Sequence, residues 1–249
     1  VIAPTKIDGM IKNAEIHSPR EIDWSGEMAV NSWKEYFLPH REKIFDISGS
    51  KLTETASQQP PMACFGLHIK DLQALTLFDL AFKNDKYYQK RRDAIIVIGY
   101  SIDWLATANK KGPKYPVDFK ESELEHVRFD IFISKTKSGK TLFYAGSKKG
   151  EKLLTKFGLH DFIHMPFVGA VPEEGPDKRM LFMAEKMAMS SEHSLWDEMD
   201  KICLACGKCS NVCPTCFCFD FIDKVEPHDS RRERVRGSCF HSDFSLVAG

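Results

Sequence analysis

Apolar residues in the middle of the chain follow two periods, one typical of strands and one typical of helices. The run 94–100, Ala-Ile-Ile-Val-Ile-Gly-Tyr, is continuous and branched, as in a strand buried on both faces. Residues 62–68 predict a shorter buried strand. Four apolar residues recur at helical spacing within 71–83, which predicts a helix with Asp71 as its N-cap. This alternation of strand and helix predicts an α/β fold with a mixed sheet and flanking helices.

The same alternation continues into the second half of the chain. Residues 127–133 alternate between apolar and polar side chains, which predicts a half-buried strand. A Ser-Gly turn at 138–139 and an apolar run at 141–144 predict that this strand returns as a hairpin. A short helix is expected over 148–157, with Gly158 as its terminator.

The pattern beyond residue 178 is helical and leads into a cysteine-rich end. Residues 179–189 carry methionines at helical spacing, and we expect this stripe to pack in the core rather than to bind a metal or a partner. Ser190 or Ser191 is expected to cap a further helix that delivers the chain to Cys203. Loops are expected at 57–61, 101–126 and 164–178.

Composition and charge exclude several classes of function. The 249 residues carry 35 basic and 35 acidic side chains, so the formal net charge is zero. Proteins that bind nucleic acid or a membrane surface usually carry a basic excess, so neither partner is expected. No apolar run approaches the roughly 18 residues that cross a bilayer, and the N-terminus lacks a signal pattern. We therefore expect a cytoplasmic protein without a membrane span.

Cysteines are concentrated in the last fifth of the chain. Cys64 stands alone, and we expect it to be a core thiol. A disulfide framework would spread through a small secreted domain, whereas tight clustering in a chain without a signal points to metal. The seven clustered residues are Cys203, Cys206, Cys209, Cys213, Cys216, Cys218 and Cys239.

The first four of these form the run C-x2-C-x2-C-x3-C-P over 203–214, which is the bacterial-type ferredoxin spacing. Two-residue gaps let a tight loop direct three thiolates at one cubane, and Gly207 permits the backbone that such a loop needs. In two-cluster ferredoxins the fourth cysteine binds the other cluster. Structural zinc is the main alternative, but zinc sites usually separate two cysteine pairs by a longer loop.

Three more cysteines exceed the needs of one cubane. Cys216 and Cys218 are interpreted as ligands of an additional site, or as small buried thiols. Cys239 closes the first cluster, joins the additional site or is a core thiol, and these alternatives stay open. The arginine-rich stretch 231–236 precedes Cys239 and either places positive charge near a cluster or forms a solvated loop.

The sequence offers little support for an enzyme in its own right. The chain lacks G-x-G-x-x-G, a P-loop and H-E-x-x-H. Four of the nine histidines have no paired acid at useful spacing and are expected to be core or surface residues: His68, His126, His160 and His164. Lys70 with Asp71 could line a site, and a substrate site within 60–190 is the alternative function. A zinc-stabilised interaction module is a second alternative.

The cysteine block also resembles a known family. Leu195-Trp196, the run C-x2-C-G-x-C-x3-C-P-T-C-x-C, Arg-Arg-Glu-Arg before Cys239 and Leu-Val-Ala-Gly at 246–249 are similar to the iron–sulfur (beta) subunits of cytoplasmic sulfhydrogenases and the A subunits of anaerobic sulfite reductases. Phe-Gly-Leu-His at 65–68 and Lys-Tyr-Tyr from Lys86 also resemble this family. The resemblance spans roughly 35–249.

The chain departs from the family pattern in two places. Lys70 stands where family members usually carry a cysteine, and the further cysteines that follow the strand equivalent to 94–100 are missing, so any cluster that these cysteines hold in relatives is expected to be absent here. The chain also stops where the family continues with Gly-His-Asn-Phe-Arg and a second ferredoxin run, so it looks truncated.

The resemblance implies an electron-relay subunit of a multi-subunit oxidoreductase such as a hydrogenase, a sulfite reductase or a heterodisulfide reductase-like complex. It implies one or two 4Fe–4S clusters and no flavin or nucleotide bound by this chain alone. The implied partners are a flavoprotein subunit that uses FAD and NAD(P)H and a catalytic subunit. Residues 1–190 are then the α/β domain, and residues 191–249 are a small ferredoxin-like iron–sulfur module.

Overall fold

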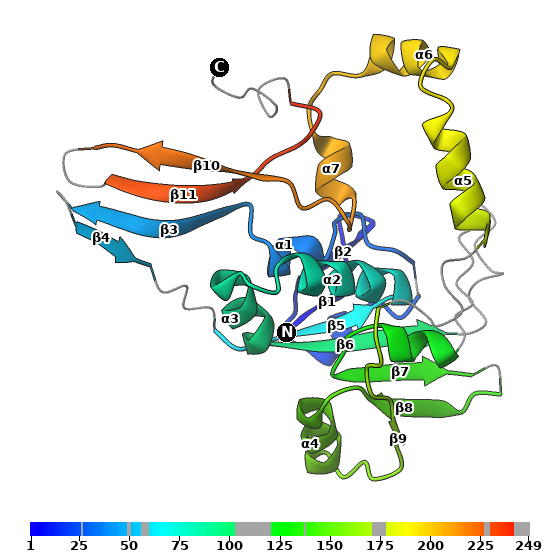
Figure 1. Ribbon diagram of the computed structural model, residues 1–249. Coiled ribbons are helices and arrows are strands. Elements are labelled where there is room, and N and C mark those ends of the chain that lie inside the picture. The colour runs from blue at the N-terminus through cyan, green and yellow to red at the C-terminus, as the bar shows by residue number, and fades with distance from the viewer. Residues whose placement is uncertain are drawn as a thin grey trace.

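The computed structural model of the chain places two β-sheets beside a set of mostly short helices (Figure 1). It describes residues 1–25, 27–48, 51–55, 60–102, 121–136, 138–170, 178–226 and 230–241. The expected loops at 57–61, 101–126 and 164–178 lie partly outside the described residues, and the motif at 246–249 lies wholly outside them.

The larger sheet has seven strands and mixed direction, in the order β2-β1-β5-β6-β7-β8-β9. The strands β1, β5, β6 and β7 run parallel, and the pairs β1–β2 and β7–β8 are antiparallel. The strands are β1 (Ile2–Ile7), β2 (Met10–Glu15), β5 (Met62–Leu67), β6 (Ile95–Ile102), β7 (Ile131–Lys135), β8 (Thr141–Ala145) and β9 (Ile163–His164). The predicted α/β fold with a mixed sheet is therefore confirmed.

Most of the helices are short, and several of them pack beside the larger sheet (Figure 1). They are the 3₁₀ helices η1 (Pro19–Glu21) and η3 (Glu121–His126) and the α-helices α1 (Lys34–Phe37), α2 (Ile69–Ala81), α3 (Lys86–Ala94), α4 (Lys148–Lys156), α5 (Lys178–Ala188), α6 (Ser194–Ile202) and α7 (Lys208–Val212). None of the helices in the described part of the chain is both long and apolar enough to cross a membrane.

The core lies where α2 crosses β5 and β6. Ile95 and Val97 of β6 are fully buried, as the continuous apolar run predicted for a strand covered on both faces. Leu72 and Phe78 of α2 belong to the same core. Cys64 of β5 is also fully buried, which confirms its prediction as a core thiol.

Helix α2 begins with a capping box rather than with the predicted Asp71 N-cap. The N-cap is His68, whose ring accepts a hydrogen bond from the backbone N–H of Lys70. Asp71 occupies the third helical position, and its carboxyl group accepts from the His68 backbone N–H at 3.1 Å. The helix therefore starts earlier than predicted, because a pair of side chains satisfies its first N–H groups reciprocally.

Replacing Asp71 with asparagine is expected to stabilise the protein increasingly as pH rises. Burial raises the pKa of Asp71 to about 6, and the hydrogen bond from the His68 backbone only partly opposes this rise. Because the pKa of Asp71 is higher in the folded state than in the unfolded state, the wild type loses stability as pH rises through 6. Asparagine does not ionise, and its side-chain oxygen can still accept the hydrogen bond from the His68 backbone N–H. Urea unfolding should show the variant's advantage growing by roughly 1 kcal/mol from about pH 5 to about pH 7.5. Asp161→Asn, at an exposed position, controls for the loss of one carboxylate.

The predicted hairpin forms, but its first strand is shorter and more buried than predicted. Strand β7 pairs antiparallel with β8, from Ile131 opposite Ala145 to Lys135 opposite Thr141. Residues 127–130 precede the strand, and its first two residues are both buried. The half-buried interpretation is therefore wrong, because the main core covers one face of β7 and α4 packs against the other. Helix α4 is followed by Gly158, which adopts the predicted left-handed conformation.

The smaller sheet joins segments that are far apart in sequence. Its order is β10-β11-β3-β4, and every neighbouring pair is antiparallel. The strands are β3 (Arg41–Ser48), β4 (Lys51–Glu54), β10 (Phe219–Lys224) and β11 (Ser230–Arg236). The arginine-rich stretch is thus a strand within a sheet, and its interpretation as a solvated loop is wrong.

Helices α5 and α6 project from the body of the molecule as an arm (Figure 1). Met183 and Met187 are 54% and 62% exposed, so the predicted core role of the methionine stripe is wrong for these two residues. Neither Ser190 nor Ser191 caps α6, because the ring of His193 accepts from the backbone N–H of Leu195 at 3.1 Å. The arm carries the chain to the cysteine-rich segment.

Candidate metal centre

The first three clustered cysteines lie on an exposed turn between α6 and α7. Cys203 is the C-cap of α6, Cys206 lies in the connecting loop, and Cys209 lies in the first turn of α7. All three are exposed, and none forms a disulfide. Cys213 is the C-cap of α7, one helical turn beyond Cys209.

Left-handed backbone at two positions gives the loop its shape. Gly207 has φ +68°, and Ala205 has φ +48°, a value that few non-glycine residues adopt. A Cβ atom added at Gly207 would lie 2.7 Å from His241 Nε2 and 3.2 Å from Ser238 Cβ. The glycine predicted from the motif is therefore required both by conformation and by close packing.

The same contact brings the segment that carries Cys239 against the first cysteine turn. The hydroxyl groups of Ser210 and Ser238 are 2.7 Å apart, and both residues are buried. Cys239 itself is exposed, next to this serine pair in sequence. Its position is compatible with closing the first cluster, which is one of the alternatives that the sequence left open.

Cys213 and Cys216 form a second, partly buried group of thiols. Burial raises the pKa of Cys213, but hydrogen bonds from Thr215 and Cys216 outweigh it and lower this pKa to about 7. The Thr215 hydroxyl lies 3.2 Å from Cys213 Sγ. Burial, followed by the hydrogen bond and charge of Cys213, raises the pKa of Cys216 to about 11. One thiol of the pair is thus prepared to ionise, as a metal ligand must.

The chain between Cys216 and Cys218 is fixed to α2 by aromatic contacts. The ring of Phe217 lies 6.0 Å from that of Phe78 and 5.6 Å from that of Phe82, in edge-to-face geometry. The carbonyl of Cys218 accepts from the backbone N–H of Gly237 at 2.9 Å. These contacts attach both cysteines to the body of the molecule.

Lys34 is a buried lysine whose role no sequence motif indicated. It lies in α1 with 2% of its surface exposed, and its Nζ donates to the carbonyls of Ser210 at 2.5 Å and Cys213 at 3.0 Å. Burial and the nearby Arg236 lower the pKa of Lys34, whereas the nearby thiols of Cys216, Cys213 and Cys218 raise it. A cation therefore holds the carbonyl end of α7 in place beside three of the seven clustered cysteines.

Arginines of β11 add positive charge to the same region. Arg234 and Arg236 line a small pocket together with Cys216 and Cys218. Arg236 donates to the Leu38 carbonyl, and Arg234 is paired with Glu42 and Asp85. The hypothesis that this stretch places positive charge near the cysteines is consistent with these positions.

The donor set of the cysteine-rich segment fits an iron–sulfur cluster. All eight cysteines are free thiols, and seven occur within residues 203–239. Among the described residues, no three His, Cys, Asp or Glu side chains already surround one point as metal ligands. Soft thiolates suit iron–sulfur clusters or zinc. Which thiols coordinate a metal stays a prediction.

Two comparisons with known proteins agree with the chemistry of this segment. Residues 202–249 match the model of the 4Fe-4S dicluster domain. Over its whole length, the chain is 25% identical to the sulfhydrogenase 2 subunit beta of Pyrococcus furiosus, of which the alignment covers 76%. The resemblance of the sequence to the iron–sulfur (beta) subunits of sulfhydrogenases is thereby confirmed. No solved structure matches the chain significantly.

Proposed function

We propose that this chain is an iron–sulfur electron-transfer subunit of a multi-subunit oxidoreductase. The ferredoxin-type cysteine run, which matches a 4Fe-4S dicluster domain, is the observation that carries this proposal. Residues 191–249 act as the electron-carrying module, and residues 1–190 form the body to which it is attached. The relative from Pyrococcus furiosus is named as a sulfhydrogenase subunit, which supports this role.

Cys203, Cys206 and Cys209 are proposed to hold three corners of one 4Fe–4S cluster. Cys213 or Cys239 supplies the fourth ligand, and Cys216 and Cys218 contribute to a second cluster. When bound, such a cluster accepts and returns one electron with little change of shape. The protein contributes the left-handed loop at Gly207, the partial burial of Cys213 and the positive charges of Lys34 and Arg236.

Partner subunits are proposed because a relay needs a donor and an acceptor. The candidates are a flavoprotein subunit and a catalytic subunit, as in the family that the sequence resembles. The arm of α5 and α6 supports a docking role, since Phe182, Trp196 and Ile202 are 56%, 46% and 70% exposed. Exposed apolar surface of this kind marks protein–protein contact sites.

Reversible reduction tests the relay role. The anaerobically purified protein should lose visible charge-transfer absorbance on addition of dithionite and regain it when a one-electron oxidant is added. The same cycle should be reproduced by reduced ferredoxin or by a reduced flavoprotein as the donor. A protein that shows no redox-dependent absorbance but retains zinc would instead be a zinc-stabilised interaction module.

Replacing Lys34 with methionine is expected to lower both stability and reduction potential. The change leaves the carbonyls of Ser210 and Cys213 without their donor, which costs about 1–3 kcal/mol. Removing a positive charge near the cluster also disfavours its reduced, more negative state, so the potential becomes more negative. Chemical unfolding and a dithionite titration monitored by EPR measure the two effects.

Lys149→Met provides the matched control. Lys149 Nζ also donates to two carbonyls, those of Asp93 at 2.9 Å and Ile95 at 3.0 Å, but the residue is exposed and lies on α4. This variant should lose less stability and leave the potential unchanged. Equal potentials in the Lys34 variant and the wild type would contradict the proposed proximity of Lys34 to the cluster.

A further inference from the structure

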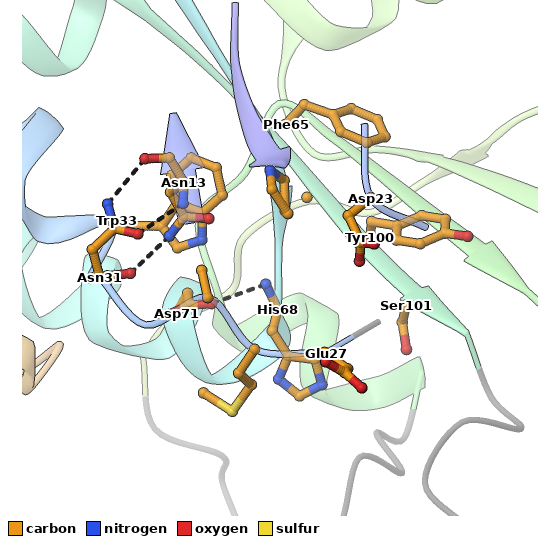
Figure 2. A pocket seen from close by; sticks show the side chains of 14 residues that line it. Asn13, Asp23, Glu27, Asn31, Trp33, Phe65, His68, Asp71, Tyr100 and Ser101 are labelled. Carbon is orange, nitrogen blue, oxygen red and sulfur yellow. Dashed lines mark hydrogen bonds between the residues drawn. The ribbon is translucent and has the colours of Figure 1, made fainter. Parts of the chain in front are cut away.

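A pocket separate from the cysteines opens at the carboxyl ends of β5 and β6 (Figure 2). Phe65 and His68 come from β5 and the residue that follows it, and Tyr100 and Ser101 come from β6. Residues from β1, β2, the first turn of α2 and the segment between η1 and α1 complete the walls. Ligands of α/β proteins usually bind at this edge of a parallel sheet, so the position favours a binding site.

Three polar atoms of the pocket are buried without a hydrogen-bond partner among the described residues. They are Asn13 Oδ1, His68 Nε2 and Ser101 Oγ. Asn13 and Ser101 are each only 3% exposed, so bulk water does not readily satisfy them. An unpaired buried polar group costs about 1–3 kcal/mol, and three such groups in one pocket point to a ligand that pairs with them.

The charges that line the pocket are negative. Asp23, Glu27 and Asp71 contribute carboxyl groups, and no lysine or arginine is among the lining residues that the structure describes. Burial and the charge of Lys70 lower the pKa of His68 to about 4, so its ring is neutral at physiological pH. The His68 Nδ1 atom accepts from the Lys70 N–H, which leaves the proton on Nε2 as a donor.

Aromatic rings form the remaining wall. Phe65 and Tyr100 line the pocket and are stacked with their centroids 6.0 Å apart. Trp24 packs edge-on against each of them at 5.4 Å, which fixes their orientation. Trp33 lines another part of the pocket. Ring faces attract cations, and an aromatic wall also accommodates an apolar body.

We propose that this pocket binds a small organic cation, a primary ammonium group attached to an apolar or aromatic body. The ammonium group pairs with Asn13 Oδ1 and with the carboxylates of Glu27 and Asp71, and the body lies against Phe65 and Tyr100. A hydroxyl or carbonyl group on the ligand pairs with Ser101 Oγ and His68 Nε2. Anions are rejected, because three carboxyl groups face them without a compensating cation among the described lining residues.

The proposal is independent of the electron-transfer role. None of the clustered cysteines is among the described residues that line this pocket, and the residues used here belong to strands, turns and helices outside 191–249. A ligand at this place would give the body of the protein a binding function of its own. Failure of cluster assembly and failure of ligand binding are therefore distinguishable in one preparation of the protein.

Three probes of nearly equal shape test the charge preference. Benzylammonium, benzyl alcohol and benzoate share an aromatic ring and differ in the charge of the attached group. Each is titrated into the full chain, purified with its metal content intact, while tryptophan fluorescence and calorimetry are recorded. Saturable binding of benzylammonium, with benzoate at least about tenfold weaker, is expected from one unfavourable charge contact. Failure of benzylammonium to bind, or equal binding of benzoate, would overturn the proposal.

Two variants place the probe in this pocket. Ser101→Ala removes a hydroxyl that has no partner among the described residues, so the unfolding temperature should not fall, while affinity for a hydroxylated probe such as 2-amino-1-phenylethanol drops about tenfold. Glu27→Gln, at an exposed position, should weaken benzylammonium binding about three- to fivefold. Glu185→Gln on α5 is the matched control and should change neither value. Unchanged affinities in both pocket variants would refute the assignment.

Discussion

Replacing Cys206 with serine is expected to abolish one iron–sulfur cluster. Cys206 lies at the centre of the C-x2-C-x2-C run, on the loop whose left-handed residues Ala205 and Gly207 set its direction. A serine hydroxyl is a poor ligand for a cluster that binds through thiolates, so this corner of the cubane stays open. A protein with one cluster should lose nearly all of its iron and acid-labile sulfide, and a protein with two should lose about half.

Cys64→Ser is the matched control for this change. Burial raises the pKa of the Cys64 thiol to about 12 and the side chain is fully enclosed in the core, so it has no role in ligation. Its iron and sulfide contents per folded chain should equal those of the wild type. The proposed ligand set would be contradicted if Cys206→Ser retained full iron content, or if the two variants lost iron equally.

Replacing Glu42 with glutamine is expected to destabilise the whole chain and to loosen the C-terminal strands. Glu42 of β3 is 7% exposed and pairs with two arginines, Arg91 of α3 and Arg234 of β11. Arg91 also donates to the Phe37 carbonyl at 2.9 Å. This network connects the smaller sheet to the helices beside the larger sheet.

The size of the effect follows from burial. Removing one partner of a buried ion pair leaves an uncompensated charge in the interior, which costs about 3–5 kcal/mol. For a chain of this length such a loss lowers the unfolding temperature by roughly 10 °C. Because β11 leads directly to Cys239, the variant is also expected to retain less iron after purification. Differential scanning fluorimetry and iron analysis measure the two consequences.

Glu54→Gln separates this network from ordinary surface ion pairs. Glu54 is exposed and pairs with Lys86, and such surface pairs contribute about 0–1 kcal/mol. Its unfolding temperature should therefore lie within a few degrees of the wild type. If the Glu42 and Glu54 variants had the same unfolding temperature, the buried network would not be what fixes the C-terminal strands.

Elements defined by contiguous apolar residues were predictable from the sequence. Strand β6 and helix α2 are indicated by the spacing of apolar residues within each segment, without knowledge of the residues they pack against. The hairpin of β7 and β8 is indicated by the short turn between its strands. Boundaries were less predictable, as at His68, where a capping box extends α2 beyond the expected Asp71 cap. Cap geometry depends on side-chain orientation, which periodicity does not encode.

The smaller sheet was not predictable, because its strands pair across most of the chain. Arg234 of β11 lies opposite Glu42 of β3. A stretch rich in arginine lacks the apolar alternation of a strand, and here Arg234 is paired with Glu42 of β3 and with Asp85, the N-cap of α3. Such long-range compensation becomes visible only when the partners are known.

The two sites differ in how much the sequence revealed. Cysteine spacing alone indicated the cluster chemistry, but it could not assign all the ligands, because metal binding itself completes such sites. The pocket at β5 and β6 was missed, since its residues come from five separate segments and none forms a motif. His68 lacks an acid at catalytic spacing, yet the fold places it in one pocket with Asp71 and Asn13.

Metal analysis of the anaerobically purified chain tests the central claim most directly. Iron, acid-labile sulfide and zinc are counted per chain, and EPR spectra are recorded at low temperature after reduction with dithionite. We expect roughly four or eight irons with matching sulfide and a cubane signal from the reduced cluster. Stoichiometric zinc without sulfide would contradict the electron-transfer role and leave a structural zinc module.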